Sequence, residues 1–318
     1  MGKMTTVCGP ADPKSILYGQ VHEHIFVRQT PMAAKNPALQ LDQADLSLQE
    51  LLSYRAAGGG LLVDAQPVGA GRDAEILCRL SEESGVSIMA STGYHLLGFY
   101  KESSPLHRLS REALYTLYLS ELTKGMLPFD AGDQLCEDRR LKACAGIVKA
   151  AIPGEGPKGR YETLLCAAAR AAADGQAPLM LHTECGAHAE EAIALCISQG
   201  LRPDQMVVCH VDRQAEDFSV HERIAEKGVY LDYDTIGRFR YHSDEAEISL
   251  LRHMVEKGYA SQILLALDTT AARLAAYGGE IGLCYLLEQF YPQLCREDFE
   301  EQVLERFSIL NLRALFNG

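Results

Sequence analysis

The chain has 318 residues, of which 47% are hydrophobic and 23% are charged, and this composition is that of a folded protein rather than a disordered or fibrous one. Thirty Lys and Arg residues against 43 Asp and Glu residues give a net charge of −13, which opposes binding to nucleic acid or to an anionic membrane. The first residues lack the apolar run of a signal peptide, and no apolar stretch approaches the roughly 18 residues that span a bilayer, so we expect a cytoplasmic protein.

Short apolar runs that end in polar residues alternate with longer stretches whose apolar positions have helical spacing. This alternation predicts parallel strands joined by crossover helices, and the continuously apolar runs predict strands that are covered on both faces. The predicted strands are, in chain order, 16–24, 60–67, 87–94, 145–151, 178–184, 206–212, 229–235 and 263–269. The predicted helices are 47–57, 72–84, 110–125 with 133–144, 161–174, 189–199, 221–227, 245–257 and 282–290.

Eight β/α units in one chain predict an α/β fold of the (β/α)₈ TIM-barrel type, forming one domain over residues 1–318. A doubly wound open sheet remains the alternative, because counting strands does not establish that the sheet closes. No internal repeat, low-complexity run or linker suggests a second domain.

Two histidines end the first predicted strand, in the sequence Val-His-Glu-His. Side chains alternate along a strand, so His22 and His24 face the same way and can chelate a divalent metal, although two purely structural histidines explain this motif equally well. More residues of this kind fall at the carboxyl ends of other predicted strands, where barrel enzymes place their active sites: Lys149, His182, His210 and Asp268. Each has an ordinary explanation alone, but together they predict a metal site. Such ligands suit Zn²⁺, Mn²⁺ and Co²⁺ alike, and we expect zinc first.

Lys149 is an unusual residue in such a set, because a protonated amine has no lone pair. A lysine that is desolvated beside cations can lose its proton and add carbon dioxide. The resulting carbamate has two oxygens, one for each of two metal ions. We therefore expect N6-carboxylysine at position 149.

The order HxH, Lys, His, His and Asp over successive strands, together with the segments GQVHEH, STGYH, GIVKA, LHTE, CHVDR and LALDTT, resembles the phosphotriesterase family of the amidohydrolase superfamily. Within it, the segments after the third, seventh and eighth strands look like those of the phosphorylated furanose lactonases. The resemblance implies that His22, His24 and Asp268 hold one metal and that His182 and His210 hold a second. Carboxylated Lys149 would bridge the two ions with a hydroxide, and Asp268 would pass a proton to the leaving group. A homodimer is also implied.

Side chains after the last two predicted strands could reach the mouth of one pocket: Arg238, Arg240, Arg273 and Tyr277. Because arginine binds phosphate through paired hydrogen bonds, they predict a small anionic substrate, with a phosphorylated sugar lactone as the first hypothesis. Tyr94 and His95 follow the third strand, where a substrate ring could pass. The alternatives are that the arginines pair with nearby acids at the surface and that Tyr94 is packed.

Two other functions stay open. A broader lactonase or carboxylesterase with weak phosphotriester hydrolysis would use an apolar pocket formed by Leu96, Leu97, Phe99 and Phe239. The organophosphate-cleaving members relay a proton through an acid and a histidine, whereas this chain has Arg213 in CHVDR and no histidine in LDYDTIGR. A metal-binding barrel without catalysis would lack one of the ligands, and all of them are present here.

Overall fold

The computed structural model describes residues 4–129 and 139–317. Eight parallel strands form one sheet, in which every strand is hydrogen-bonded to its neighbours in chain order. They are β3 (Gly19–Glu23), β4 (Leu61–Asp64), β5 (Ser87–Gly93), β6 (Ile147–Ala151), β7 (Leu179–His182), β8 (Met206–Cys209), β9 (Tyr230–Tyr233) and β10 (Ile263–Leu265). All the predicted strands are confirmed. A doubly wound sheet is excluded, because its strand order reverses at a switch point and this order does not.

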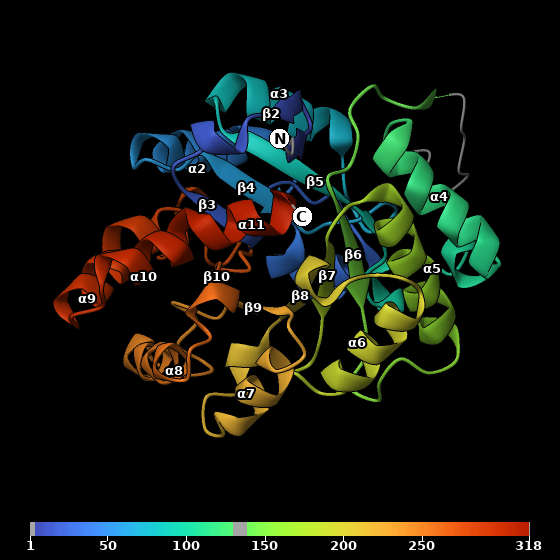
Figure 1. The fold of residues 1–318 in the computed structure, drawn as a ribbon. Helices are drawn as coiled ribbons and strands as arrows, with labels where there is room; N and C mark the ends of the chain where they lie inside the picture. Colours follow the sequence, from blue (N-terminus) through green and yellow to red (C-terminus); the bar gives the residue numbers. More distant parts are fainter. Residues whose placement is uncertain (1–3, 130–138, 318) are drawn as a thin grey trace.

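The main helices alternate with the strands and surround the sheet (Figure 1). They are α2 (Ala44–Ala56), α3 (Ala74–Ser84), α4 (Arg111–Thr123), α5 (Arg160–Gly175), α6 (Ala189–Ser198), α7 (Ser219–Ala225) and α8 (Asp244–Glu256). Shorter elements are the antiparallel hairpin of β1 (Met4–Thr6) and β2 (Gly9–Ala11), then α1 (Pro31–Lys35), α9 (Tyr291–Arg296), α10 (Glu301–Glu305) and α11 (Asn311–Asn317). Among the described residues, no helix has both the length and the apolar character needed to cross a membrane.

The helix predicted for residues 133–144 is wrong where the structure describes it. Residues 139–144 are not α-helical, and residues 133–138 lie outside the described part of the chain. The N–H of Leu141 donates to the carbonyl oxygen of Met126, and the N–H of Met126 donates to that of Ala143. Backbone pairing with a distant segment has therefore replaced the hydrogen bonds of a local helix. The helix predicted for 282–290 begins later, as the π-helical segment η11 (Leu286–Phe290) that continues into α9.

The sheet closes into a barrel through contacts between its first and last strands. The N–H of Asp268 donates to the carbonyl oxygen of His22 over 3.1 Å. The buried carboxylate of Glu23 accepts hydrogen bonds from the N–H of Leu267 at 2.8 Å and from the hydroxyl of Thr269 at 2.7 Å. A side chain therefore supplies part of the hydrogen bonding at this seam, and nothing in the sequence pattern had singled out Glu23 for that role.

The barrel interior is apolar and is closed at one end by the C-terminal segment. Val21, Met180 and Leu264 belong to an interior cluster that also includes Leu312 of α11. The side-chain amide of Asn311 donates to the carbonyl oxygen of Ile263, the first residue of β10. Because α11 covers the amino ends of the strands, the polar side chains at the carboxyl ends are left at the open end of the barrel (Figure 1).

A buried histidine outside this end gives a test of the packing. In His221 of α7, Nε2 donates to the carbonyl oxygen of Gln214 at 2.8 Å and Nδ1 accepts from the hydroxyl of Tyr233 at 3.0 Å. Burial lowers the pKa of His221 from 6.5 to about 4. As pH falls below 6.5, His221 is protonated in the unfolded chain but stays neutral in the folded chain, which favours unfolding. The contribution of His221 to the free energy of unfolding is therefore complete above pH 6.5 and is lost as pH falls towards 4.

Between pH 7 and pH 5 we expect this histidine to account for a loss of about 2 kcal/mol in the free energy of unfolding. Urea unfolding of the unsubstituted chain and of His221→Gln at both pH values measures that loss. The variant should lose less stability than the unsubstituted chain over this interval. Equal losses would show that His221 is not held neutral in the folded state.

Candidate metal centre

Three of the predicted ligands meet at the open end of the barrel. His22, His24 and Asp268 each place one ligand atom within 4.8 Å of the others. Oδ1 of Asp268 lies 3.4 Å from Nε2 of His24 and 3.8 Å from Nε2 of His22. Two ligand atoms that each bind one ion at about 2.1 Å are roughly 3.4 Å apart in tetrahedral geometry. The spacing and the chemistry of these nitrogen and oxygen donors therefore fit a divalent metal.

A second pair lies beside the first group. Nε2 of His210 is 2.7 Å from Nδ1 of His182, and both side chains are buried. The backbone of His210 has φ of 65° and that of Asp268 has φ of 47°, a left-handed conformation that L residues rarely adopt. Such conformations persist where the surrounding structure enforces them, and they cluster at functional sites. Here they occur at two of the predicted ligands.

Lys149 of β6 lies beside His22 and is fully buried. Its Nζ is 3.2 Å from Nε2 of His22 and 3.2 Å from Sδ of Met180. No acid forms an ion pair with Lys149 among the residues that the structure describes, and a buried ammonium without an acidic partner is unfavourable. Conversion of the amine to a carbamate held by two cations would remove that cost.

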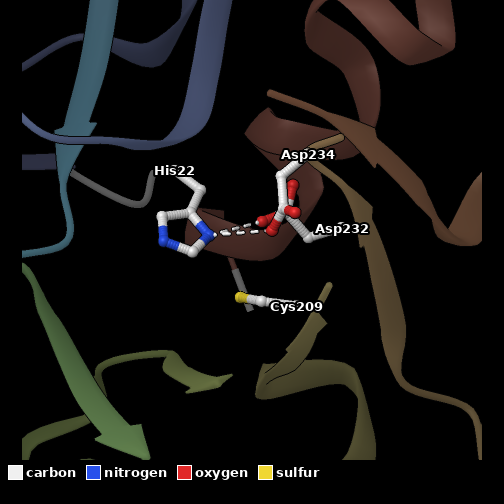
Figure 2. A group of neighbouring side chains, drawn as sticks. All are labelled: His22, Cys209, Asp232 and Asp234. Atoms are coloured by element: carbon white, nitrogen blue, oxygen red, sulfur yellow. Dashed lines mark hydrogen bonds and ion pairs between the residues drawn. The ribbon is translucent and has the colours of Figure 1, made fainter. Parts of the chain in front are cut away.

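Two aspartates of the β9 segment, neither of them predicted from the sequence as a site residue, contact the Nδ1 atoms of the histidines. Nδ1 of His22 lies 3.0 Å from one carboxylate oxygen of Asp232 and 3.0 Å from one of Asp234, as Figure 2 shows. Asp234 also contacts Nδ1 of His210 at 2.7 Å. With Nδ1 donating to carboxylates, each histidine keeps its Nε2 lone pair for the centre. Burial lowers the pKa of His22 and that of His210 to about 3, so both rings are neutral.

The two aspartates differ in charge. Burial raises the pKa of Asp232 well above its usual range, and the neighbouring Asp234 adds to this effect. Burial alone would raise the pKa of Asp234 too, but interaction with His210 and hydrogen bonds from both histidines outweigh it and lower that pKa. Cys209, drawn below them in Figure 2, is buried, and burial raises the pKa of its thiol, so it stays protonated. Asp234 is therefore the anionic member of this group.

Two arginines hold the outer oxygen of Asp268. Oδ2 lies 2.8 Å from Arg238 and 3.0 Å from Arg213. Burial would raise the pKa of Asp268, but Arg238 and a hydrogen bond from His24 outweigh it and lower the pKa well below its usual range. The carboxylate is thus ionised, with Oδ1 facing the histidines and Oδ2 facing the arginines. Arg213 was not predicted as a site residue, and its place after His210 in CHVDR was the only available signal.

A cavity of about 380 Å³ opens over these groups, and its volume suits a small-molecule ligand. The predicted substrate residues His95, Arg238, Arg240 and Arg273 all line it. Arg273, however, is engaged by main-chain oxygens, including that of Ile236 at 2.6 Å. Leu96 and Phe99 of the predicted apolar group are in the wall, whereas Leu97 and Phe239 are not.

Two predicted substrate residues are not brought to this cavity. The hydroxyl of Tyr277 contacts Oγ of Ser47 and donates to the carbonyl oxygen of Gln43, both at 2.9 Å, so it fastens the segment after β10 to the α2 region. Tyr94 is fully buried in the packing between sheet and helices. Neither tyrosine is among the residues that line the cavity. Tyr94 is thus a packing residue, as in the alternative stated for it above.

The chain is similar in sequence and in fold to known proteins. The model of the phosphotriesterase family matches residues 2–316. A phospho-furanose lactonase from Mycoplasmopsis synoviae is 28% identical over 302 residues, covering 91% of this chain and 84% of that protein. An N-acetyltaurine hydrolase from Homo sapiens is 28% identical over 356 residues, covering 98% of this chain and 96% of that protein. The crystal structure of an amidohydrolase from Mycoplasma synoviae has the same fold, with a TM-score of 0.93 at 24% identity over 99% of this chain and 92% of that one. The chain therefore belongs to the phosphotriesterase family, and it is a hydrolase whose buried His/Asp cluster is consistent with a binuclear metal site.

Proposed function

We propose that this chain is a metal-dependent lactonase that opens a phosphorylated sugar lactone. In this proposal His22, His24 and Asp268 hold one divalent ion, His182 and His210 hold a second, and N6-carboxylated Lys149 lies between the two. The observation that carries the proposal is the cavity itself, in which the four histidines and Asp268 share the walls with arginines although the chain has a net charge of −13. Zinc is the first expectation for both ions, with Mn²⁺ and Co²⁺ as alternatives.

Bound there, two divalent ions would supply Lewis acidity, ionising a water molecule and polarising the carbonyl group that is attacked. The chain's own residues set up the proton transfer. Asp268 is ionised and fixed by two arginines, so its carboxylate can accept a proton from the attacking water and deliver it to the leaving alcohol. Positioning by Arg213 and Arg238 keeps one carboxylate oxygen directed at the centre.

His95 is suited to bind the substrate as a hydrogen-bond donor. Its Nδ1 accepts the N–H of Leu96 at 2.7 Å, so the proton of the neutral ring is on Nε2. Burial lowers the pKa of His95 well below its usual value, and nearby His182 adds to the effect, which keeps the ring neutral. The ring stacks on Phe99 at a centroid distance of 3.9 Å and is thereby fixed in the cavity wall.

Arg240 is the arginine best placed to bind the phosphate. It is exposed, lines the cavity, and contacts Tyr241 through a hydrogen bond of 2.8 Å and through the face of the ring. No acid is paired with Arg240 among the described ion pairs, whereas Arg213 and Arg238 are committed to Asp268. The guanidinium of Arg240 is thus left for an anionic group that enters the cavity mouth.

Arg240→Ala is expected to lower kcat/KM for a phosphorylated lactone roughly 10- to 100-fold, because one charged hydrogen-bond partner of the substrate is lost. The same substitution should barely change turnover of the corresponding dephosphorylated lactone. Steady-state kinetics on both substrates check this, with Arg252→Ala, a half-exposed arginine on α8, as the matched control. If the dephosphorylated lactone reacts as fast as the phosphorylated one, the phosphate requirement is wrong.

A second candidate is hydrolysis of an amide that carries a sulfonate. The support is the similarity of nearly the whole chain to an N-acetyltaurine hydrolase. Sulfonate and phosphate are both anionic groups to which arginine binds well. Including N-acetyltaurine in the same panel of substrates decides between amide hydrolysis and lactone hydrolysis.

Uncharged lactones and aryl esters in the panel test the broader esterase, for which the apolar wall of Leu96 and Phe99 is the argument. Absence of turnover on every substrate would favour the non-catalytic barrel.

A further inference from the structure

Two buried acids and a histidine form a second group of possible metal ligands outside the cavity wall. Asp212 lies in the short 3-10 turn η8 (Val211–Arg213), Glu247 lies on α8, and His242 lies just before α8. Each of these residues places one ligand atom within 4.8 Å of the others. None of the three lines the cavity. The proposed catalysis makes no use of them.

The carboxylates of this group are buried without adequate partners. Glu247 is 0% exposed, and neither of its carboxylate oxygens has a hydrogen-bond partner. Oδ1 of Asp212 is likewise unpartnered, while its other carboxylate oxygen accepts the N–H of Thr235 at 2.6 Å. In the described part of the chain no lysine or arginine is ion-paired with either residue: Glu247 has only His242 within ion-pair distance, and neighbouring Arg213 is ion-paired with Asp268.

Buried polar groups in proteins are almost always hydrogen-bonded, and two buried acids with unpartnered oxygens are costly unless something neutralises them. Burial raises the pKa of Glu247 well above its usual range, and Asp212 and Asp244 add to this rise. A proton or a metal cation must therefore occupy the group. The residue types and spacing distinguish between these two occupants.

We infer that Asp212, His242 and Glu247 form a binding site for one divalent cation, separate from the proposed two-metal site at His22, His24, His182, His210 and Asp268, called here the paired centre. Nε2 of His242 donates a hydrogen bond to the main-chain oxygen of Asp212 at 2.7 Å and lies 3.3 Å from a carboxylate oxygen of Glu247, so a cation that displaced the Nε2 proton would find nitrogen and oxygen ligands already together. Neighbouring ligands of one ion lie roughly 3.4 Å apart in tetrahedral geometry when each is about 2.1 Å from it, close to the separation of His242 and Glu247. A set of one imidazole and several oxygens suits Mn²⁺ or Zn²⁺.

The position of Asp212 in the sequence, between two residues that line the cavity, suggests that the proposed cation would stabilise the structure next to the cavity. Asp212 stands between His210, which contacts His182, and Arg213, which contacts Asp268. A cation that joined Asp212 to α8 would fix η8, and with it the positions from which both neighbours reach the cavity. The role requires no contact between this cation and the substrate.

The test is the number of Mn²⁺ ions bound by the full-length chain after removal of its metals with a chelator. Free Mn²⁺ is followed by electron paramagnetic resonance during titration in a bicarbonate buffer. We expect Glu247→Gln and His242→Ala each to bind one Mn²⁺ fewer than the unsubstituted chain. Glu256→Gln, which changes an exposed acid at the end of the same helix, should bind as many as the unsubstituted chain.

The readout is a difference of one ion, so it does not depend on whether the paired centre binds two ions, one or none. Repeating the titration in a His24→Asn background should give the same difference, which separates failure of this site from failure of the proposed function. His242 is partly exposed, and His242→Ala decides the matter if Glu247→Gln does not fold. Equal numbers of Mn²⁺ in the unsubstituted chain and these variants would overturn the inference and leave a proton as the neutralising group.

Discussion

Lys149→Met is expected to lower kcat/KM at least about 1,000-fold, a loss of roughly 4 kcal/mol of transition-state stabilisation, and to remove at least one bound metal ion per chain. Methionine is close to lysine in length and suits the buried position beside Met180, so the barrel interior should be preserved. It has no amine to carboxylate, however, and cannot supply oxygens to two cations. Metal content by mass spectrometry after reconstitution, together with kinetics on the substrate panel, measures both losses.

Carbon dioxide provides the control for this prediction. The unsubstituted chain reconstituted with metal in CO₂-free buffer should resemble the variant and recover when bicarbonate is added, whereas Lys149→Met should not respond to bicarbonate. Lys142→Met, which removes an exposed lysine, should behave like the unsubstituted chain. A Lys149→Met chain that keeps its full metal content would show that the amine is no part of the centre.

Asp234→Asn is expected to weaken metal binding by the paired centre about 100-fold, because removal of a hydrogen-bond partner behind a ligand typically costs 10- to 100-fold. The carboxylate of Asp234 accepts from Nδ1 of His22 and from both Nδ1 and the N–H of His210. An amide has a single oxygen and cannot serve both rings. One ring would then carry its proton on Nε2, where the lone pair is needed.

Asp232→Asn is the matched comparison, since Asp232 contacts His22 and not His210. It is expected to weaken metal binding only about 10-fold, at the lower end of the range for such residues. Competition between each protein and a zinc chelator gives the affinities, and circular dichroism confirms that both variants are folded. Comparable affinities for the two variants would mean that Asp234 does not serve both sides of the centre.

The sequence predicted the barrel and its polar end well, because both depend on a local pattern. A continuously apolar run followed by a polar residue specifies a buried parallel strand and the chemistry at its carboxyl end, as for His182, the last residue of β7. Lys149, expected at the end of its strand, is instead the middle residue of β6. The rule that successive side chains point to opposite faces of a strand predicted the side-chain directions in β3 less accurately. Val21 belongs to the interior cluster and His22 also faces inward, which is possible because the register of β3 shifts between Gln20 and Glu23.

The residues that orient the ligands could not be found in this way. Asp232 and Asp234 lie in a predicted strand, but an aspartate that supports a histidine looks the same in sequence as one that faces solvent. The contacts of side chains in loops could not be predicted from the sequence either, as three residues show: Arg213, Arg238 and Tyr277. All three follow strands, yet the two arginines reach Asp268 and the tyrosine reaches Ser47. Loop conformation depends on such tertiary contacts, which have no period in the sequence.

A crystal structure of the full-length chain grown with zinc and bicarbonate, with diffraction recorded at the zinc absorption edge, tests the proposed centre most directly. The expected result is two anomalous peaks about 3.5 to 4 Å apart, one beside His24 and Asp268 and the other beside His182 and His210. Density for a carboxylate on Nζ of Lys149 should lie between the peaks. An unmodified Nζ still against Met180, with no peak beside His182, would contradict the binuclear centre on which the proposed chemistry depends.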